Sequence, residues 1–265
     1  MAKPKTGTRE WSDRSFNLQA GCSHGCLYCY ARERALRFGQ IADGADWTTE
    51  TPFDRAATLA KARVRRRGGV TMFPTTHDIV PANLDFCEDV LIALLVAGNR
   101  VLVVSKAHLD CFARLTRVRQ TRASQIEFRV TLGGLDPATL RFWEPAAPEP
   151  AERIEALKLA KARGFKTSVS AEPLLEPWEP LRLVEAVEPF AETIWIGACN
   201  DIRRRTAWAR APKPKAGLEK HVGRLEEWQT PGGVRSVAYQ LRDNPKVRWK
   251  ESIAEALGLN AEEVG

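Results

Sequence analysis

Short apolar runs alternate with longer helical patterns along most of the chain. Six runs predict strands, at residues 15–20, 70–73, 100–105, 126–132, 166–171 and 193–198. Most are rich in β-branched or aromatic side chains, which favour strands. Apolar positions at helical spacing predict helices at residues 29–38, 54–67, 84–97, 107–120, 150–163 and 181–187. Because strands that alternate with helices form right-handed βαβ units, the pattern predicts an α/β fold with a parallel sheet.

Six such units would make a partial (β/α)6 TIM-like barrel, with its working face at the carboxyl ends of the strands. Residues 1–13 are polar and predict an extended N-terminal arm, and residues 14–200 would form the barrel. Residues 201–265 are expected to be a basic extension packed on the barrel, in which Gly232 and Gly233 interrupt the pattern and residues 252–257 form a short helix.

Composition narrows the class of protein. The 265 residues are 44% hydrophobic and 28% charged, which supports a folded core and argues against a disordered chain. The longest apolar stretch, at residues 90–97, is far short of the roughly 20 residues that span a bilayer. The first residues contain no apolar signal segment, so we expect a cytoplasmic protein whose six cysteines are reduced rather than paired in disulfides.

Half of these cysteines lie in one short segment. Cys22, Cys26 and Cys29 form a Cys-x3-Cys-x2-Cys motif between the first predicted strand and the first helix. Gly21 and Gly25 permit tight turns, so three thiolates can converge on one metal centre, and thiolates are the usual ligands of iron–sulfur clusters. Three ligands would leave one iron of a four-iron cluster open to a second molecule. The alternatives are a structural zinc site that includes His24, and a chance grouping of buried cysteines.

With Tyr28 before the third cysteine, the motif resembles the radical S-adenosylmethionine (SAM) superfamily, and GCSHGCLYCYAR is most similar to its spore photoproduct lyase-like branch. Weaker similarity lies in residues 76–80, 141–145 and 170–173, and the resemblance covers residues 14–200. It implies a partial barrel, a [4Fe-4S] cluster held by the three cysteines, and SAM bound at the open iron. Reduction by an external donor such as flavodoxin or ferredoxin would cleave SAM to methionine and a 5′-deoxyadenosyl radical that abstracts hydrogen from a substrate.

The chain departs from this branch at one position. In spore photoproduct lyases, a cysteine just ahead of a Ser-Asp-Ile-Val-like stretch donates the hydrogen atom that quenches the product radical. Aligning that stretch on residues 78–80 places Thr75 at the cysteine's position, and a hydroxyl O–H bond is too strong for this role. Thymine-dimer repair is therefore not assigned. Cys199, at the end of the sixth predicted strand, is the alternative hydrogen donor, whereas Cys87 and Cys111 lie in predicted helices and are expected to be packing residues.

Polar residues at the ends of the second and third strands are candidates for SAM binding. Thr75, Thr76 and Asp78 follow the second strand, where the superfamily contacts the SAM amino group. Asp78 would accept hydrogen bonds from that ammonium or, alternatively, cap a helix. Ser105 and Lys106 end the third strand, and Lys106 would hold a carboxylate or phosphate or remain a solvated lysine.

Later strands add further candidates. Arg129, within the fourth strand, would meet an anionic SAM or substrate group or pair with Glu172. Glu172 itself could bind ribose hydroxyls. Asn200 is a candidate cavity residue, while Trp195 is expected in the core and His77 as a hydrogen-bonded scaffold residue.

The net charge of +7 is concentrated in basic runs at residues 61–67, 114–122 and 203–215, the last of which includes Trp208. Clustered basic residues near an aromatic ring can bind the phosphates and bases of DNA or RNA, although solvated basic helix faces give the same pattern. Only the third run is expected near the working face. The leading hypothesis is a radical SAM enzyme whose substrate could be a nucleic acid or nucleotide. The alternatives are a nucleic-acid-binding protein with a structural zinc or iron–sulfur site and no turnover, and a redox sensor.

Overall fold

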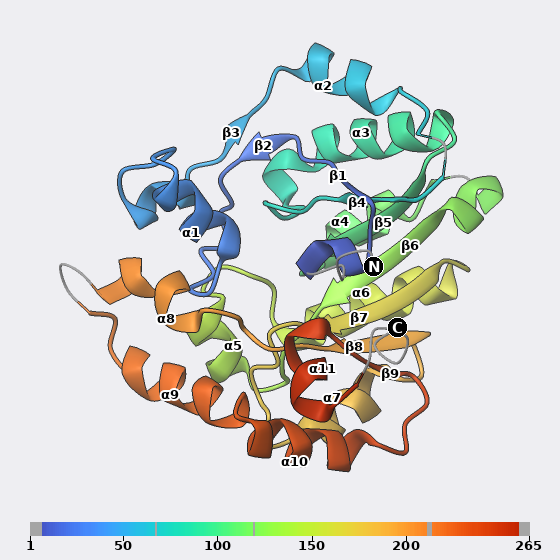
Figure 1. Ribbon diagram of the computed structural model, residues 1–265. Coiled ribbons are helices and arrows are strands. Elements are labelled where there is room, and N and C mark those ends of the chain that lie inside the picture. The colour runs from blue at the N-terminus through green and yellow to red at the C-terminus, as the bar shows by residue number, and fades with distance from the viewer. Residues whose placement is uncertain (1–6, 67, 119, 211–213, 260–265) are drawn as a thin grey trace.

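The computed structural model describes residues 7–66, 68–118, 120–210 and 214–259 (Figure 1). Within these residues, a parallel sheet of seven strands has the order β1-β4-β5-β6-β7-β8-β9. Its strands are β1 (Arg14–Ser15), β4 (Val70–Phe73), β5 (Arg100–Ser105), β6 (Ile126–Thr131), β7 (Lys166–Ala171), β8 (Thr193–Ile196) and β9 (Val247–Trp249). The predicted α/β partial barrel is confirmed, with one strand more than expected.

Helices follow most strands, as the alternation predicts. They are α1 (Tyr30–Arg37), α2 (Arg55–Ala62), α3 (Leu84–Val96), α4 (Leu109–Leu115), α5 (Pro137–Trp143), α6 (Pro150–Ala162), α7 (Pro180–Val187), α8 (Ile202–Arg205), α9 (Leu218–Trp228), α10 (Pro231–Leu241) and α11 (Glu251–Leu257). The strands β4 to β7 are buried along nearly their whole length, because a parallel sheet in such a fold is covered on both faces. None of the described helices combines the length and hydrophobicity that crossing a bilayer requires.

The first predicted strand, at residues 15–20, is wrong as a single element. The chain leaves the sheet after β1, and β2 (Gln19–Ala20) instead pairs antiparallel with β3 (Thr51–Pro52). Between them, Asn17 Oδ1 accepts hydrogen bonds from the backbone N–H groups of Thr75 and Thr76, and the Leu18 N–H donates to His77. These contacts to the loop after β4 replace strand pairing at this point.

Residues 201–265 contribute more structure than the sequence indicates. β9 extends the sheet beside β8, with Ile194 opposite Val247. Gly232 and Gly233 do not interrupt a helix but lie in the first turn of α10, where a Cβ on Gly233 would come within 2.4 Å of the Trp228 backbone oxygen. Figure 1 shows α9 and α10, in orange and red, along one side of the molecule. The division of the chain into three parts remains a prediction.

The N-terminal arm is not extended where it is described, because residues Gly7–Glu10 form a 3-10 helix; residues 1–6 lie outside the described part. Lys250 Nζ lies 2.9 Å from the Gly7 oxygen and 2.8 Å from Glu10 Oε1. The Trp11 ring packs 3.8 Å from the same ammonium. These contacts tie the arm to the residue that follows β9.

Candidate functional site

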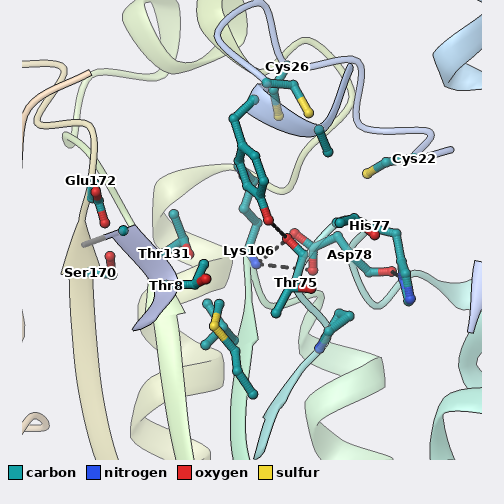
Figure 2. A pocket seen from close by; sticks show the side chains of 18 of the residues that line it. Thr8, Cys22, Cys26, Thr75, His77, Asp78, Lys106, Thr131, Ser170 and Glu172 are labelled. Atoms are coloured by element: carbon teal, nitrogen blue, oxygen red, sulfur yellow. Dashed lines mark hydrogen bonds between the residues drawn. The ribbon is translucent and has the colours of Figure 1, made fainter. Parts of the chain in front are cut away.

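A cavity of about 440 Å³ opens at the carboxyl ends of the strands, within the range of small-molecule sites. Its wall brings together most of the predicted residues: Cys22, Cys26, Cys29, Thr75, Thr76, Asp78, Ser105, Lys106 and Glu172. Figure 2 shows Cys22 and Cys26 on the loop beside Asp78 and Lys106, with Glu172 across the cavity. The structure therefore places these side chains around one space, and the individual roles given to them remain predictions.

The cysteine loop has the backbone that its glycines allow. Gly21 and Gly25 have φ angles of +82° and +65°, and a Cβ on Gly21 would lie 2.1 Å from a backbone oxygen. The three thiols are free, and Cys29 caps α1 by accepting from a backbone N–H at 3.5 Å. Burial raises the pKa of Cys26 to about 12 and that of Cys22 further, and the neighbouring cysteines add to both shifts. All three cysteines line the same cavity.

Arg32 is a buried cation beside the cysteine loop, and its surroundings indicate whether the loop suits a thiolate-bound cluster. Arg32 is 0% exposed, and its Nε and Nη2 atoms have no hydrogen-bond partner in the described part of the chain. Its Nη1 donates to the backbone oxygens of Gly25 and Cys26 at 3.4 and 3.2 Å. Among the described residues, no three His, Cys, Asp or Glu side chains are already arranged to hold a metal ion. The fit therefore rests on the donor chemistry: three thiols beside a buried positive charge suit a negatively charged thiolate centre.

His24 is not placed to complete a zinc site. It is 1% exposed, with Nε2 3.0 Å from His108 Nε2 and Nδ1 3.3 Å from Asp78 Oδ2. Because both ring nitrogens face these partners, neither is directed to a metal held by the cysteines. The arrangement disfavours the zinc alternative.

Asp78 connects the loops after β4 and β5. Its carboxylate accepts from the Ile79 and Lys106 backbone N–H groups at 2.7 and 3.0 Å, and from the Ser105 hydroxyl. Burial alone would raise the pKa of Asp78, but His24 and these neighbours hold it well below its usual range. The alternative interpretation, in which Asp78 caps a helix, is wrong, because Val80 and Asn83 occupy the cap positions that follow.

Lys106 supplies a positive charge to the cavity. Burial lowers the pKa of its ammonium, but the opposing effects of Cys26, Glu144 and Asp78 raise it above the ordinary value, so the group stays protonated. Its Nζ lies 5.8 Å from the centre of the Tyr28 ring and forms no ion pair within the described residues. The ammonium is free to bind an anionic group in the cavity.

Sequence reasoning missed a buried ionic network behind the cysteine loop. The Tyr28 hydroxyl donates to Glu144, whose other oxygen lies 2.5 Å from Arg153 Nη2. Glu144 and Arg153 are each 1% exposed. The adjoining backbone supports the loop, since the Leu27 N–H donates to the Trp143 oxygen at 2.8 Å. The only sequence signal was the resemblance at residues 141–145, which gave no hint of the partner.

Asn17 is a second residue that was missed. It fixes the loop after β4 through the bonds described above, and its Nδ2 donates to Thr75 Oγ1 at 2.8 Å. The Tyr30 hydroxyl donates to the Thr75 backbone oxygen at 2.6 Å. His77 is the expected scaffold residue: its Nε2 accepts from the Leu18 N–H at 3.2 Å. Thr75 therefore lines the cavity with its hydroxyl already bonded.

Three predicted site residues lie away from the cavity wall. Arg129 pairs with Glu127 at 2.8 Å rather than with Glu172, and its guanidinium packs 4.6 Å from the Trp11 ring. Cys199 and Asn200 line a separate shallow pocket. β8 ends at Ile196, earlier than predicted, so Cys199 and Asn200 lie three and four residues beyond the end of the strand. Cys199 is not part of the cavity wall, although its sulfur contacts Arg205, which is; its role as a hydrogen donor stays a prediction.

The third basic run is largely neutralised by acidic neighbours. Arg203 pairs with Glu226 at 2.6 Å, Arg204 with Asp201 at 2.6 Å, and Arg210 with Glu219 at 2.8 Å. The Trp208 ring packs on Arg32 and is not presented to a nucleobase. Arg67, Arg119 and Lys213 lie outside the described residues. The paired arginines of this run therefore give little support to nucleic-acid binding, whereas Arg205, from the same run, lines the cavity.

Comparison with known proteins agrees with the fold. No family model matches the chain. A protein of Acidianus two-tailed virus, called uncharacterized protein ORF301, is 26% identical over 179 residues, which cover 64% of this chain and 58% of the viral protein. The chain thus spans less than two thirds of that relative.

Two solved structures share the architecture. Spore photoproduct lyase, in a cysteine-to-alanine mutant with dinucleoside spore photoproduct, superposes with a TM-score of 0.57 over 93% of this chain and 78% of that one, at 14% identity. SuiB of Streptococcus suis bound to the precursor peptide SuiA gives a TM-score of 0.52 over 92% and 48%, at 13% identity. The chain therefore has the fold of spore photoproduct lyase and SuiB.

Proposed function

We propose that the protein is a radical SAM enzyme that cleaves SAM reductively at a [4Fe-4S] cluster held by Cys22, Cys26 and Cys29. The observation that carries this proposal is the meeting of three free thiols on one loop at the cavity, beside the buried and unpaired Arg32. When bound, the cluster and SAM would supply one-electron cleavage and a 5′-deoxyadenosyl radical for hydrogen abstraction. An external donor such as flavodoxin or ferredoxin would provide the electron.

The chain's own residues would bind and orient SAM. The Lys106 ammonium would hold its carboxylate, and the loop at Thr75 and Thr76, fixed by Asn17, would carry the amino group. Glu172, across the cavity, would accept from the ribose hydroxyls. Burial raises the pKa of Glu172 overall, although Lys250, whose Nζ lies 3.5 Å from Glu172 Oε2, acts in the opposite direction.

The substrate would carry an anionic group, and a nucleotide or nucleic acid is the class we propose. Arg9 and Arg205 both line the cavity. Arg205 contacts the Cys199 sulfur at 3.8 Å and has no ion pair within the described residues. Two arginines at the edge of the cavity would attract a phosphate. Repair of a thymine dimer is not proposed, because Thr75 stands where the hydrogen-donating cysteine is expected.

Metal analysis after anaerobic reconstitution separates this proposal from a nucleic-acid-binding protein with a structural zinc. We expect about four irons per chain, a brown chromophore, and an altered spectrum of the reduced cluster on addition of SAM. Cys26→Ala should remove all three signals. Cys111→Ala, which truncates a fully buried cysteine on α4, is the matched control and should keep them. One zinc and no iron would contradict the proposal.

A further inference from the structure

Among the described residues, Arg32 differs from the three other Arg and Lys residues that are at most 5% exposed. Arg129, Arg153 and Lys250 each have a carboxylate within 2.8 Å, at Glu127, Glu144 and Glu10 respectively. Arg32 is equally buried, yet its hydrogen bonds within the described residues go to two backbone oxygens of the cysteine loop.

Two nitrogen atoms of Arg32, Nε and Nη2, have no acceptor among the residues that the structure describes. Arg32 lies on the first turn of α1, three residues after Cys29, so its guanidinium lies against the same loop that carries the thiols. Leaving a buried guanidinium without an anion destabilises a protein strongly. The donors and the charge both point to a negatively charged group at the cysteines.

Trp208, from the C-terminal extension, closes the other side of this guanidinium. Its ring centre lies 3.9 Å from Arg32 Cζ, and its Nε1 lies 3.4 Å from the Leu27 oxygen in the cysteine loop. Gly44 provides the space, since a Cβ there would come within 2.6 Å of Trp208 Cβ. The ion pair of Arg204 with Glu33, at 3.1 Å, also joins the extension to α1. The indole thus keeps Arg32 against the loop and water away from it.

We propose that Arg32 is the counter-ion of the cysteine site, that Trp208 is a positioning residue that holds it there, and that together they raise the reduction potential of the bound cluster. This rests on the proposed function. One electron from the external donor adds one negative charge to the site, and no bond forms or breaks in that step. A fixed positive charge in a water-excluded position stabilises the reduced state more than the oxidised one, because interactions between charges are stronger at low dielectric.

The test is a redox titration of the reconstituted full-length protein without SAM. The electron paramagnetic resonance signal of the reduced cluster monitors the titration. Arg32→Gln should make reduction at least about tenfold less favourable, which is a fall of about 59 mV for a one-electron couple. Arg32→Lys keeps the charge and should stay closer to the wild type. Arg37→Gln is the matched control: it removes a charge from the same helix, but its side chain is 52% exposed, so the potential should not move.

Trp208→Leu provides a second route that leaves Arg32 in place. It should lower the potential by less than Arg32→Gln and speed the loss of iron to a chelator, because water reaches the guanidinium. If Arg32→Gln does not retain iron, the potential of Trp208→Leu decides. A wild-type potential with full iron content in Arg32→Gln, or in Trp208→Leu where Arg32→Gln loses iron, would overturn the inference and leave the proposed function standing. Failure of the wild-type chain to bind iron would overturn the proposed function itself.

Discussion

Replacing Arg153 by methionine removes one partner of the buried ion pair behind the cysteine loop. Glu144 would remain 1% exposed, and of the described groups that lower its pKa, the Tyr28 hydroxyl and the Lys106 ammonium would remain. Breaking a buried pair in this way costs about 3–5 kcal/mol. Because domains are stable by only about 5–15 kcal/mol, the loss would be a large fraction of the free energy of unfolding.

Urea unfolding of the full-length chain, followed by circular dichroism, measures this loss. With a slope of roughly 3 kcal/mol per molar urea, a loss of about 3–5 kcal/mol lowers the midpoint by about 1–1.7 M. Arg141→Met is the matched control, since Arg141 pairs with Glu149 on the surface, where the two side chains are 64% and 47% exposed. Such pairs contribute about 0–1 kcal/mol.

The double variant Glu144→Gln/Arg153→Met checks the physical cause. It removes both charges while keeping an acceptor for the Tyr28 hydroxyl, so it should recover much of the stability lost in Arg153→Met. If Arg153→Met costs no more than Arg141→Met, or if the double variant is less stable than the single one, the reasoning about an uncompensated buried charge is wrong.

Three further predictions concern the loop, the cavity and pH. Gly21→Ala should abolish iron uptake, because the Cβ would lie 2.1 Å from a backbone oxygen, whereas Gly39→Ala, with a similar φ of +64° and open space, should retain it in the same iron assay. Lys106→Met should weaken SAM binding to the reconstituted protein at least about tenfold by calorimetry with unchanged iron content, as expected for loss of a charge-assisted contact, and unaltered affinity would refute a role in holding the carboxylate. Burial alone would raise the pKa of Glu127, but Arg129 and the other partners of this carboxylate lower the pKa overall. The ionised Glu127 therefore stabilises the fold above its unfolded-state pKa of about 4.3, and this stabilisation is lost as pH falls through its folded-state pKa. The melting temperature, measured from acid to neutral pH, should depend less steeply on pH in Glu127→Gln than in the wild type. Parallel curves for the two proteins would contradict the stabilising role of Glu127.

Most of the sheet could be predicted because its signals are local. The strands β4 to β8 are compact apolar runs separated by helical patterns, so each is visible in a short stretch of sequence. β9 has three residues and owes its conformation to pairing with β8, which no local pattern encodes. The break between β1 and β2 depends on Asn17, whose partners Thr75 and Thr76 lie on a distant loop.

The candidate site also has one part that local sequence signals predict and another that depends on distant residues. The cysteine motif is a local spacing, and its position at the carboxyl ends of the strands follows from the fold. The burial of Arg32 could not be predicted, because it requires Trp208 from the other end of the chain and the space above Gly44. Cys199 was predicted to lie at the cavity because the end of the preceding strand was predicted about two residues too late.

The most direct test of the central claim is formation of 5′-deoxyadenosine by the anaerobically reconstituted protein supplied with SAM and dithionite, measured by chromatography. We predict 5′-deoxyadenosine and methionine in equal amounts from the wild-type protein and none from Cys26→Ala. Full iron content without any 5′-deoxyadenosine would contradict the proposed SAM cleavage.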